Sequence, residues 1–284
     1  MYGKINRMEQ SPGVCEVLQP SAPKERMTAL ENKCAIKMEN ITKRFGKVVA
    51  NNAINMELRE GEILSLLGEN GSGKTTLMNM LSGIYFPDEG QIYIHDKPVT
   101  IASPKDAFAL GIGMIHQHFK LVDLFTATEN IILGLEGKLD LANARKKVQD
   151  ICDKYGFDID PDMKIYDMSV SQKQTVEIVK VLYRGADILI LDEPTAVLTP
   201  QETDKLFAVM RNMKADGKSL IIITHKLHEV LDVSDRVAVL RKGEYIGDVA
   251  TKDADQQSLT DMMVGHTVSL NINRPEPKNV EKRL

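Results

Sequence analysis

The residues Gly68-Glu69-Asn70-Gly71-Ser72-Gly73-Lys74-Thr75 are the most informative stretch of this chain. They fit the pattern of a glycine, any four residues, a second glycine, a lysine, and a serine or threonine, which is typical of phosphate-binding loops. The apolar run 63–67 before the stretch predicts a strand, and residues 75–81 predict a helix. The alternative is an ordinary glycine-rich turn, but the complete pattern favours the phosphate loop.

The chemistry of this loop suits a nucleoside triphosphate. Glycine reaches positive φ without steric cost, so the loop glycines let successive backbone N–H groups curl around an anion, next to the positive end of the helix dipole. We expect Lys74 to reach the β- and γ-phosphates, Thr75 to offer its hydroxyl to Mg²⁺, and Thr76 to add a donor. The residues expected to bind nucleotide here are Gly68, Asn70, Gly71, Ser72, Gly73, Lys74, Thr75 and Thr76.

Two acidic residues, Asp192 and Glu193, end a continuous apolar run at 188–191. Such a run is typical of a central parallel strand that is buried on both faces. The carboxylates are then expected at the carboxyl edge of the sheet, with Asp192 holding Mg²⁺ and Glu193 polarising the attacking water. Adjacent strand residues point to opposite faces, which suits this division of roles. The alternative is a pair of solvated acids at a strand end.

With both stretches in place, the chain resembles the nucleotide-binding subunits of ABC transporters over roughly residues 36–265. The resemblance implies that Gln117 contacts Mg²⁺ and the water, that His225 contacts the γ-phosphate, and that Phe45 stacks on adenine. The catalytic residues that it implies are Glu193, His225 and Lys74, and the metal ligands are Thr75, Gln117 and Asp192.

Each of the three later residues has an alternative reading. Phe45 could pack beneath the first hairpin, because aromatic side chains near strands usually belong to a core. Gln117 could be an ordinary polar residue at a strand end, and His225 could be a cap or a surface residue. The order and spacing of the motifs favour the functional reading for all three.

The chain departs from the family at Met168-Ser169-Val170-Ser171-Gln172, which corresponds to the signature loop. In the family this loop caps the γ-phosphate held by a partner subunit, and the resemblance implies this role for Ser169 and Gln172. Ser171 stands where the family has a second glycine, and its side chain could crowd the phosphate or turn the amide away. Two outcomes stay open: a weakened composite site, or a tolerated variant.

Changes of pattern along the chain predict its organisation. Residues 35–58 alternate apolar and polar types, and 90–95 reads as a strand before a turn at 96–98, which predicts an antiparallel β-layer. Helical periodicity takes over at 126–183, which predicts a helical subdomain at about 118–185. We therefore expect an α/β fold: a P-loop NTPase core with an antiparallel β-layer and an inserted α-helical subdomain.

The domain is expected to span residues 35–265, after a disordered extension at 1–34 and before a linker at 266–284, where prolines stand among charges. Its further elements are predicted helices at 144–155, 174–183 and 200–215, buried strands at 188–191 and 220–223, and a closing hairpin of 235–240 and 244–249.

Composition favours a soluble subunit in a reducing compartment. The chain has 284 residues, of which 43% are hydrophobic and 27% charged, which is enough to bury a core. No run approaches the roughly 18 consecutive apolar residues that a membrane helix needs. The three cysteines lack paired spacing, and a net charge of −4 without charge blocks gives little support to nucleic-acid binding.

The resemblance implies a transport function, with ATP and Mg²⁺ as cofactors. The chain is most like the first half of a tandem importer ATPase for nucleosides or simple sugars. The implied partners are a second nucleotide-binding domain, a transmembrane permease met by residues 118–133 and, indirectly, a solute-binding protein, at the cytoplasmic face of the cell membrane. The alternatives are a non-transport ABC-type ATPase and a regulatory half that binds ATP with weak turnover.

Overall fold

An antiparallel sheet forms the first layer of the molecule, as the alternating residues predict. The computed structural model describes residues 33–135, 137 and 140–265. The predicted turn at 96–98 is wrong by one residue. The turn lies at His95 and Asp96, which adopt positive φ (48° and 62°), and Lys97 already begins the next strand. The sheet has the order β2-β1-β4-β5, with β1 Cys34–Phe45, β2 Val48–Arg59, β4 Glu89–Ile94 and β5 Lys97–Val99.

The second sheet is mostly parallel and confirms the predicted core. Its strands β3, β6, β7 and β8 are apolar runs, and every residue of β3, β7 and β8 is buried. Strand β10 pairs antiparallel with β9 and forms the predicted closing hairpin. The order is β10-β9-β3-β8-β7-β6, with β3 Ile63–Leu67, β6 Ile112–Ile115, β7 Ile188–Asp192, β8 Ser219–Thr224, β9 Arg236–Arg241 and β10 Glu244–Ala250.

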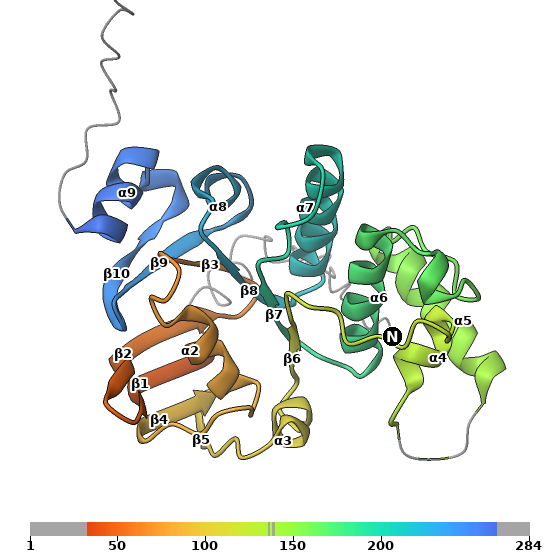
Figure 1. The fold of residues 1–284 in the computed structure, drawn as a ribbon, viewed down its shortest axis with the longest axis horizontal. Coiled ribbons are helices and arrows are strands. Elements are labelled where there is room, and N and C mark those ends of the chain that lie inside the picture. The colour runs from red at the N-terminus through yellow and green to blue at the C-terminus, as the bar shows by residue number, and fades with distance from the viewer. Residues whose placement is uncertain (1–32, 136, 138–139, 266–284) are drawn as a thin grey trace, which may run out of the picture.

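Helices cover both faces of the parallel sheet (Figure 1). One face packs on α2 and the antiparallel sheet through residues such as Leu66 and Ile190, and the other packs on α7 through residues such as Leu189 and Leu191. Because both faces of the sheet are buried, the strands are uninterrupted apolar runs in the sequence. The helices here are α2 Lys74–Leu81, α3 Pro104–Ala109, α7 Pro200–Ala215, α8 Leu227–Val233 and α9 Gln256–Val264, with a 3₁₀ turn at Thr251–Asp253.

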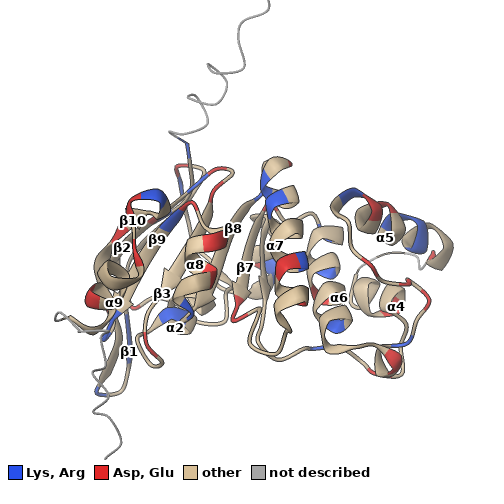
Figure 2. Cartoon of the chain, turned by 90° about the horizontal axis from the view of Figure 1, so that it is seen from above, with Lys and Arg blue, Asp and Glu red and all other residues tan. Residues whose placement is uncertain are grey.

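The predicted helical subdomain lies at one end of the molecule and has a core of its own (Figure 1). Two of its helices begin earlier than predicted, because Asp140 and Ser169 cap their first turns through side-chain hydrogen bonds. Positively and negatively charged residues both occur along α5 and along α7 (Figure 2). The subdomain elements are α4 Ala127–Ile132, α5 Leu141–Tyr155, a 3₁₀ turn at Ile165–Asp167 and α6 Val170–Tyr183.

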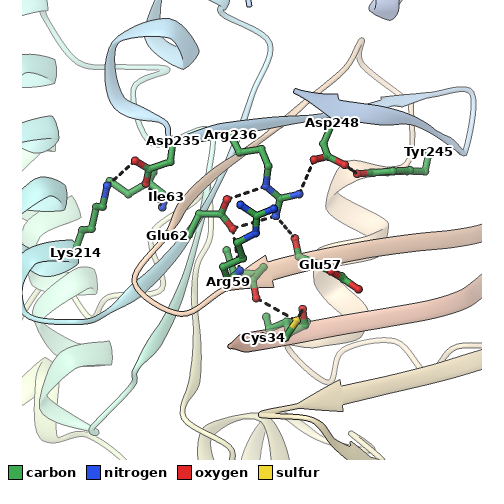
Figure 3. A network of polar contacts seen from close by, with 12 residues as sticks. Cys34, Glu57, Arg59, Glu62, Ile63, Lys214, Asp235, Arg236, Tyr245 and Asp248 are labelled. Atoms are coloured by element: carbon green, nitrogen blue, oxygen red, sulfur yellow. Dashed lines mark hydrogen bonds and ion pairs between the residues drawn. The ribbon is translucent and has the colours of Figure 1, made fainter. Parts of the chain in front are cut away.

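A buried arginine joins the two sheets (Figure 3). Arg236 on β9 donates two hydrogen bonds to Glu62, at 2.8 and 3.0 Å, and one to Asp248 on β10 at 2.8 Å. It also donates to the backbone carbonyl of Glu57, on β2 of the antiparallel sheet, at 2.7 Å. Arg236 therefore adds a polar connection between the two layers to the apolar core that they share.

The predicted extension lies outside the described residues except for 33 and 34, and the predicted linker at 266–284 lies wholly outside them. Within the described part of the chain, no helix has both the length and the apolar character needed to cross a membrane.

Candidate functional site

The carboxyl edge of the parallel sheet gathers most of the predicted site. Strands β3, β8 and β7 are neighbours, and β6 lies beside β7. The phosphate loop follows β3, Glu193 follows β7, His225 follows β8, and Gln117 comes two residues after β6. The carboxyl ends of parallel strands are the usual place for a ligand in an open α/β sheet, so the topology brings together residues that lie far apart in the sequence.

The phosphate loop depends on its glycines in two ways. Gly71 and Gly73 have φ values of 81° and 99°, in the left-handed region that glycine adopts without strain. The φ of Gly68 lies outside that region, so the prediction was wrong about its backbone. A Cβ at Gly68 would instead overlap the carbonyl oxygen of Leu240 and the hydroxyl of Ser72, so a close approach requires this glycine.

Lys74 opens α2 with its ammonium group turned back over the loop. Its Nζ donates to the backbone carbonyls of Gly68 at 2.7 Å and Glu69 at 2.9 Å, and the residue is buried. Burial lowers the pKa of Lys74, and the negative charges of Glu193 and Asp192 oppose that shift. The lysine is thus a buried cation between the loop and the two predicted acids.

The remaining loop residues differ in their surroundings. Asn70 and Thr75 are exposed, and Thr76 is half-buried in the first turn of α2. Ser72 is buried, and its hydroxyl has no hydrogen-bond partner within the described part of the chain. An unpartnered buried hydroxyl in a loop of this type fits a phosphate oxygen as acceptor.

Asp192 is the last residue of β7 and is almost fully buried, at 7% exposure. Burial raises its pKa and the charge of Glu193 adds to the rise, whereas a hydrogen bond from Thr75 and the charge of Lys74 act against it. The ionised form of Asp192 is therefore disfavoured, chiefly because the carboxylate is buried. A hydroxyl beside a carboxylate is an oxygen donor pair that suits Mg²⁺, whose charge would favour the ionised aspartate.

The cost of burying the ionised Asp192 predicts a gain in stability for Asp192→Asn. The raised pKa means that the folded chain disfavours the ionised aspartate, so a penalty exists at every pH above that pKa and disappears as the pH falls toward the unfolded value. In metal-free buffer we expect the asparagine variant to have the higher Tm at pH 7 and the difference to shrink on acidification. Differential scanning calorimetry across that pH range measures both. A variant that melts below the wild type at pH 7 would contradict the inference that the folded chain disfavours the ionised Asp192.

Glu193 and His225 form a pair. The Nδ1 atom of His225 lies 2.8 Å from the Oε1 atom of Glu193. Glu193 has a φ of 48°, which is unusual for a residue other than glycine, so it has left the strand and the two-residue alternation used to predict its direction does not apply to it. Strained backbone of this kind persists only where neighbouring contacts hold it.

A buried polar cluster beside this pair supplies such contacts. Glu229 on α8 is 4% exposed and accepts hydrogen bonds from Thr195 at 2.6 Å and Thr224 at 3.3 Å. Lys226 lies 2.9 Å from Glu229 and donates to the Thr195 carbonyl at 2.9 Å. Thr195 lies two residues after Glu193, while Thr224 and Lys226 flank His225, so the cluster fastens the two loops together.

The sequence reading missed this cluster and also Gln174. Gln174 lies in α6, is buried, and donates to the backbone carbonyl of Pro194 at 2.7 Å. Gln174 lies among other polar residues at 171–175, so its neighbours in the sequence offered no signal for it. Glu229 reads as an ordinary charged residue of a helix that begins only after His225, so the sequence offered no signal for it either.

Phe45 and Gln117 lie at exposed positions. Phe45 ends β1 with 43% of its surface exposed, so the alternative of packing beneath the hairpin does not describe it. Its ring meets Tyr85 edge-on, with centroids 5.2 Å apart, and the Lys43 Nζ lies 5.6 Å from its centroid. Gln117 is exposed in the segment after β6.

Ser169 and Gln172 lie apart from the phosphate loop, in the helical subdomain. They form a capping box at the start of α6: the Gln172 amide donates to the Ser169 hydroxyl at 3.3 Å, and the Ser169 amide donates to the Gln172 side chain at 3.0 Å. Ser171 lies in the first turn of α6, 3.3 Å from the Ser169 hydroxyl, and also hydrogen-bonds to Glu202. Its backbone is helical, so this position does not require glycine.

Comparison with known proteins identifies the family of the chain. The family model for ABC transporters matches residues 51–196. The chain belongs to the ABC transporter family. The predicted family and fold class are therefore confirmed. A domain of this family implies ATP binding.

Individual relatives are named as import proteins. The chain is 52% identical over 257 residues to the nucleoside import ATP-binding protein NupA of Lactococcus lactis, covering 88% of this chain and 51% of NupA. It is 44% identical over 271 residues to the glucose import ATP-binding protein TsgD13 of Haloferax volcanii, covering 84% of this chain and 49% of that protein. The chain thus spans about half the length of these curated relatives.

A solved structure shares the fold and is a dimer. The ATP-binding cassette MJ0796, in a post-hydrolysis state bound to ADP and phosphate, superposes with a TM-score of 0.66 at 26% identity. The match covers 76% of this chain and 98% of that cassette.

Proposed function

We propose that this chain binds and hydrolyses ATP as the motor of an importer for nucleosides or simple sugars. The observation that carries the proposal is the Glu193–His225 pair, joined at 2.8 Å, on the sheet edge that also bears the phosphate loop. The names of the relatives NupA and TsgD13 support import and the two classes of cargo.

The phosphate loop has the role of binding the triphosphate. Backbone N–H groups around Gly71 and Gly73 surround the phosphates at the N-terminus of α2, and Lys74 adds its charge. Phe45, which has an exposed ring at the end of β1, stacks on the adenine. The nucleotide-binding set is Phe45, Gly68, Asn70, Gly71, Ser72, Gly73, Lys74, Thr75, Thr76 and Gln117.

Thr75, Asp192 and Gln117 are the side chains proposed for Mg²⁺. Among the described residues, no three His, Cys, Asp or Glu side chains gather as a metal-binding group. That suits Mg²⁺, which takes few protein ligands and keeps its waters and the substrate phosphates. When bound, the ion offsets the phosphate charge that develops during the reaction.

Hydrolysis is assigned to Glu193. Its carboxylate accepts a proton from the attacking water while the water oxygen bonds to the γ-phosphorus and the bond to the bridging oxygen of ADP breaks. The Nδ1 of His225 is engaged with Glu193, so its Nε2 remains for the γ-phosphate. The products are ADP and inorganic phosphate.

A second nucleotide-binding domain is proposed to complete each site. Ser169 and Gln172 lie at the N-terminus of α6, where the helix dipole favours an anion, and the dimeric state of MJ0796 supports a paired arrangement. The backbone of Ser171 favours the tolerated variant over the weakened site. In this proposal residues 35–265 form one such domain.

The membrane partner is proposed to be a permease on whose cytoplasmic side the chain sits, with a solute-binding protein acting through it and no nucleic acid involved. Several apolar side chains in the helical subdomain are exposed near one another in the chain: Val122, Leu124 and Phe125. Leu124 is 73% exposed. An exposed group of apolar side chains is typical of a surface that contacts another protein.

The proposal predicts that MgATP raises the Tm of the chain and that the shift depends on Lys74. A ligand at a hundred times its Kd adds about 2.7 kcal/mol, which for a domain of this size is about 5–10 °C. Lys74→Ala should lose most of that shift. Differential scanning fluorimetry with ATP and Mg²⁺ measures it, with Lys205→Ala as a lysine control on α7. A wild-type chain that melts at the same temperature with and without MgATP would overturn the proposed function.

A further inference from the structure

Asn51 is a buried amide that touches the phosphate loop from the antiparallel sheet. It lies on β2 at 0% exposure, where the other buried side chains are Ile54, Met56 and Leu58. Its Nδ2 donates to the backbone carbonyl of Gly73 at 3.2 Å. Its Oδ1 has no hydrogen-bond partner among the residues that the structure describes.

The Asn51 amide, of which only one end has a hydrogen-bond partner among the described residues, lowers the free energy of unfolding relative to an apolar side chain at the same place. A buried polar atom without a partner loses its hydration and gains nothing in exchange. Leucine has nearly the same branching as asparagine and would place apolar atoms in an apolar layer. A leucine at position 51 would leave no backbone group without a partner. The Gly73 carbonyl also accepts a hydrogen bond from the Leu77 backbone amide at 2.9 Å, the first bond of α2. Packing alone therefore does not explain Asn51.

The Asn51 hydrogen bond acts on the peptide unit between Gly73 and Lys74. That unit is planar, and its C=O and N–H point in opposite directions, so a carbonyl fixed from two sides also fixes the Lys74 N–H. The N–H points out of the N-terminus of α2, toward the place of an anion. The asparagine thus orients a phosphate donor that it does not itself touch.

Backbone contacts extend this attachment along the loop. The Ser72 carbonyl accepts from the Gly243 amide at 3.1 Å, and the Gly243 carbonyl accepts from the Asn52 amide at 2.8 Å. A Cβ at Gly73 would lie 2.5 Å from the Ala50 carbonyl oxygen. The second half of the loop is therefore tied to β2 directly and through the β9–β10 turn.

We propose that Asn51 is a positioning residue that holds the phosphate loop ready for nucleotide at the expense of folding stability. The inference rests on the proposed binding of ATP. Without Asn51 the loop would sample more conformations, and nucleotide binding would have to order it. ATP and ADP should suffer equally, because both present phosphates to this part of the loop.

The test compares Asn51→Leu with Asn52→Leu. Asn52 is the adjacent asparagine, it is exposed, and its contact with the turn is made by its backbone amide. We expect Asn51→Leu to keep or raise the Tm of the nucleotide-free chain while weakening MgATP and MgADP by about three- to tenfold, the worth of one hydrogen bond. Asn52→Leu should change neither affinity. Isothermal titration calorimetry and scanning calorimetry give the two quantities.

An equal or higher Tm together with weaker nucleotide binding would distinguish a positioning role of Asn51 from a role in packing. Asn51→Val is a second apolar variant, whose branching suits a strand, and it should behave like the leucine variant. Wild-type affinity in both variants would overturn the inference alone, as would a lower Tm in both. A wild-type chain that binds neither nucleotide would overturn the proposed function and this inference together.

Discussion

Replacing Glu193 with glutamine is expected to slow ATP hydrolysis by about 10²- to 10⁴-fold, the contribution of a positioned general base. The amide retains the size of the carboxylate, and its oxygen can still accept a hydrogen bond from His225, so the pair keeps its geometry. It cannot take a proton from water. MgATP affinity and Tm should stay close to wild type, so the loss should appear in kcat.

The measurement is phosphate release by the chain in the presence of its paired cassette and membrane partner. Glu244→Gln is the matched control, since Glu244 is an exposed carboxylate at the start of β10. It has no hydrogen bond to the His225 side chain among the described contacts, and it should leave kcat within about twofold, as expected for a screened surface charge. A Glu193→Gln chain that retains more than a tenth of wild-type turnover would contradict the role of Glu193.

The Glu193–His225 contact adds a further condition to this prediction. Two residues that act as one unit are not additive, so His225→Ala should cost far less in the Glu193→Gln background than in the wild type. Full additivity of the two losses would show that the histidine acts elsewhere.

The predicted site was recoverable from the sequence wherever a motif sits at the end of a parallel strand. Such a strand is an apolar run, and its carboxyl end fixes the position of the residue that follows. Asp192 and Glu193 are placed by this rule, and Lys74 is placed by the rule together with the loop pattern that follows β3. Gly68 shows the limit, because its requirement comes from Leu240, a residue on a strand 172 positions away in the sequence (240 − 68).

Asn51 could not be found by alternation for a specific reason. The buried residues after it on β2 are Ile54, Met56 and Leu58, so a strict period of two would place Asn51 on the opposite face. The pairing of β1 with β2 shifts register between Ile41 and Lys43, and this irregularity turns Asn51 inward. Bulges depend on both strands of a pair, and a single strand does not reveal them.

Contacts between distant segments were equally hidden. The Glu229 cluster joins residues 34 positions apart, and Arg236 meets Glu62 across 174 positions. Each of these side chains reads as an ordinary charged residue in the sequence. Only the packed fold shows that water has been removed from around them.

Arg236→Met is expected to destabilise the fold by about 3–5 kcal/mol, because it leaves the buried carboxylate of Glu62 without its partner. Arg236 is 9% exposed and Glu62 is 7% exposed as side chains. Burial acts to lower the pKa of Arg236, but the hydrogen bonds and charges of Glu62 and Asp248 outweigh it, so the pKa lies above the ordinary range. The contacts of the Arg236 guanidinium with Glu62, Asp248 and Glu57 are drawn in Figure 3.

Arg211→Met is the matched control, since the ion pair of Arg211 with Asp232 is half-exposed, at 49% and 54%. An exposed pair contributes about 0–1 kcal/mol, so this variant should unfold within that margin of wild type in urea. Adding Glu62→Gln to Arg236→Met removes the stranded charge and should restore part of the loss, whereas the same glutamine in the wild type should destabilise. Equal costs for Arg236→Met and Arg211→Met would mean that the Arg236 network does not hold the two sheets together.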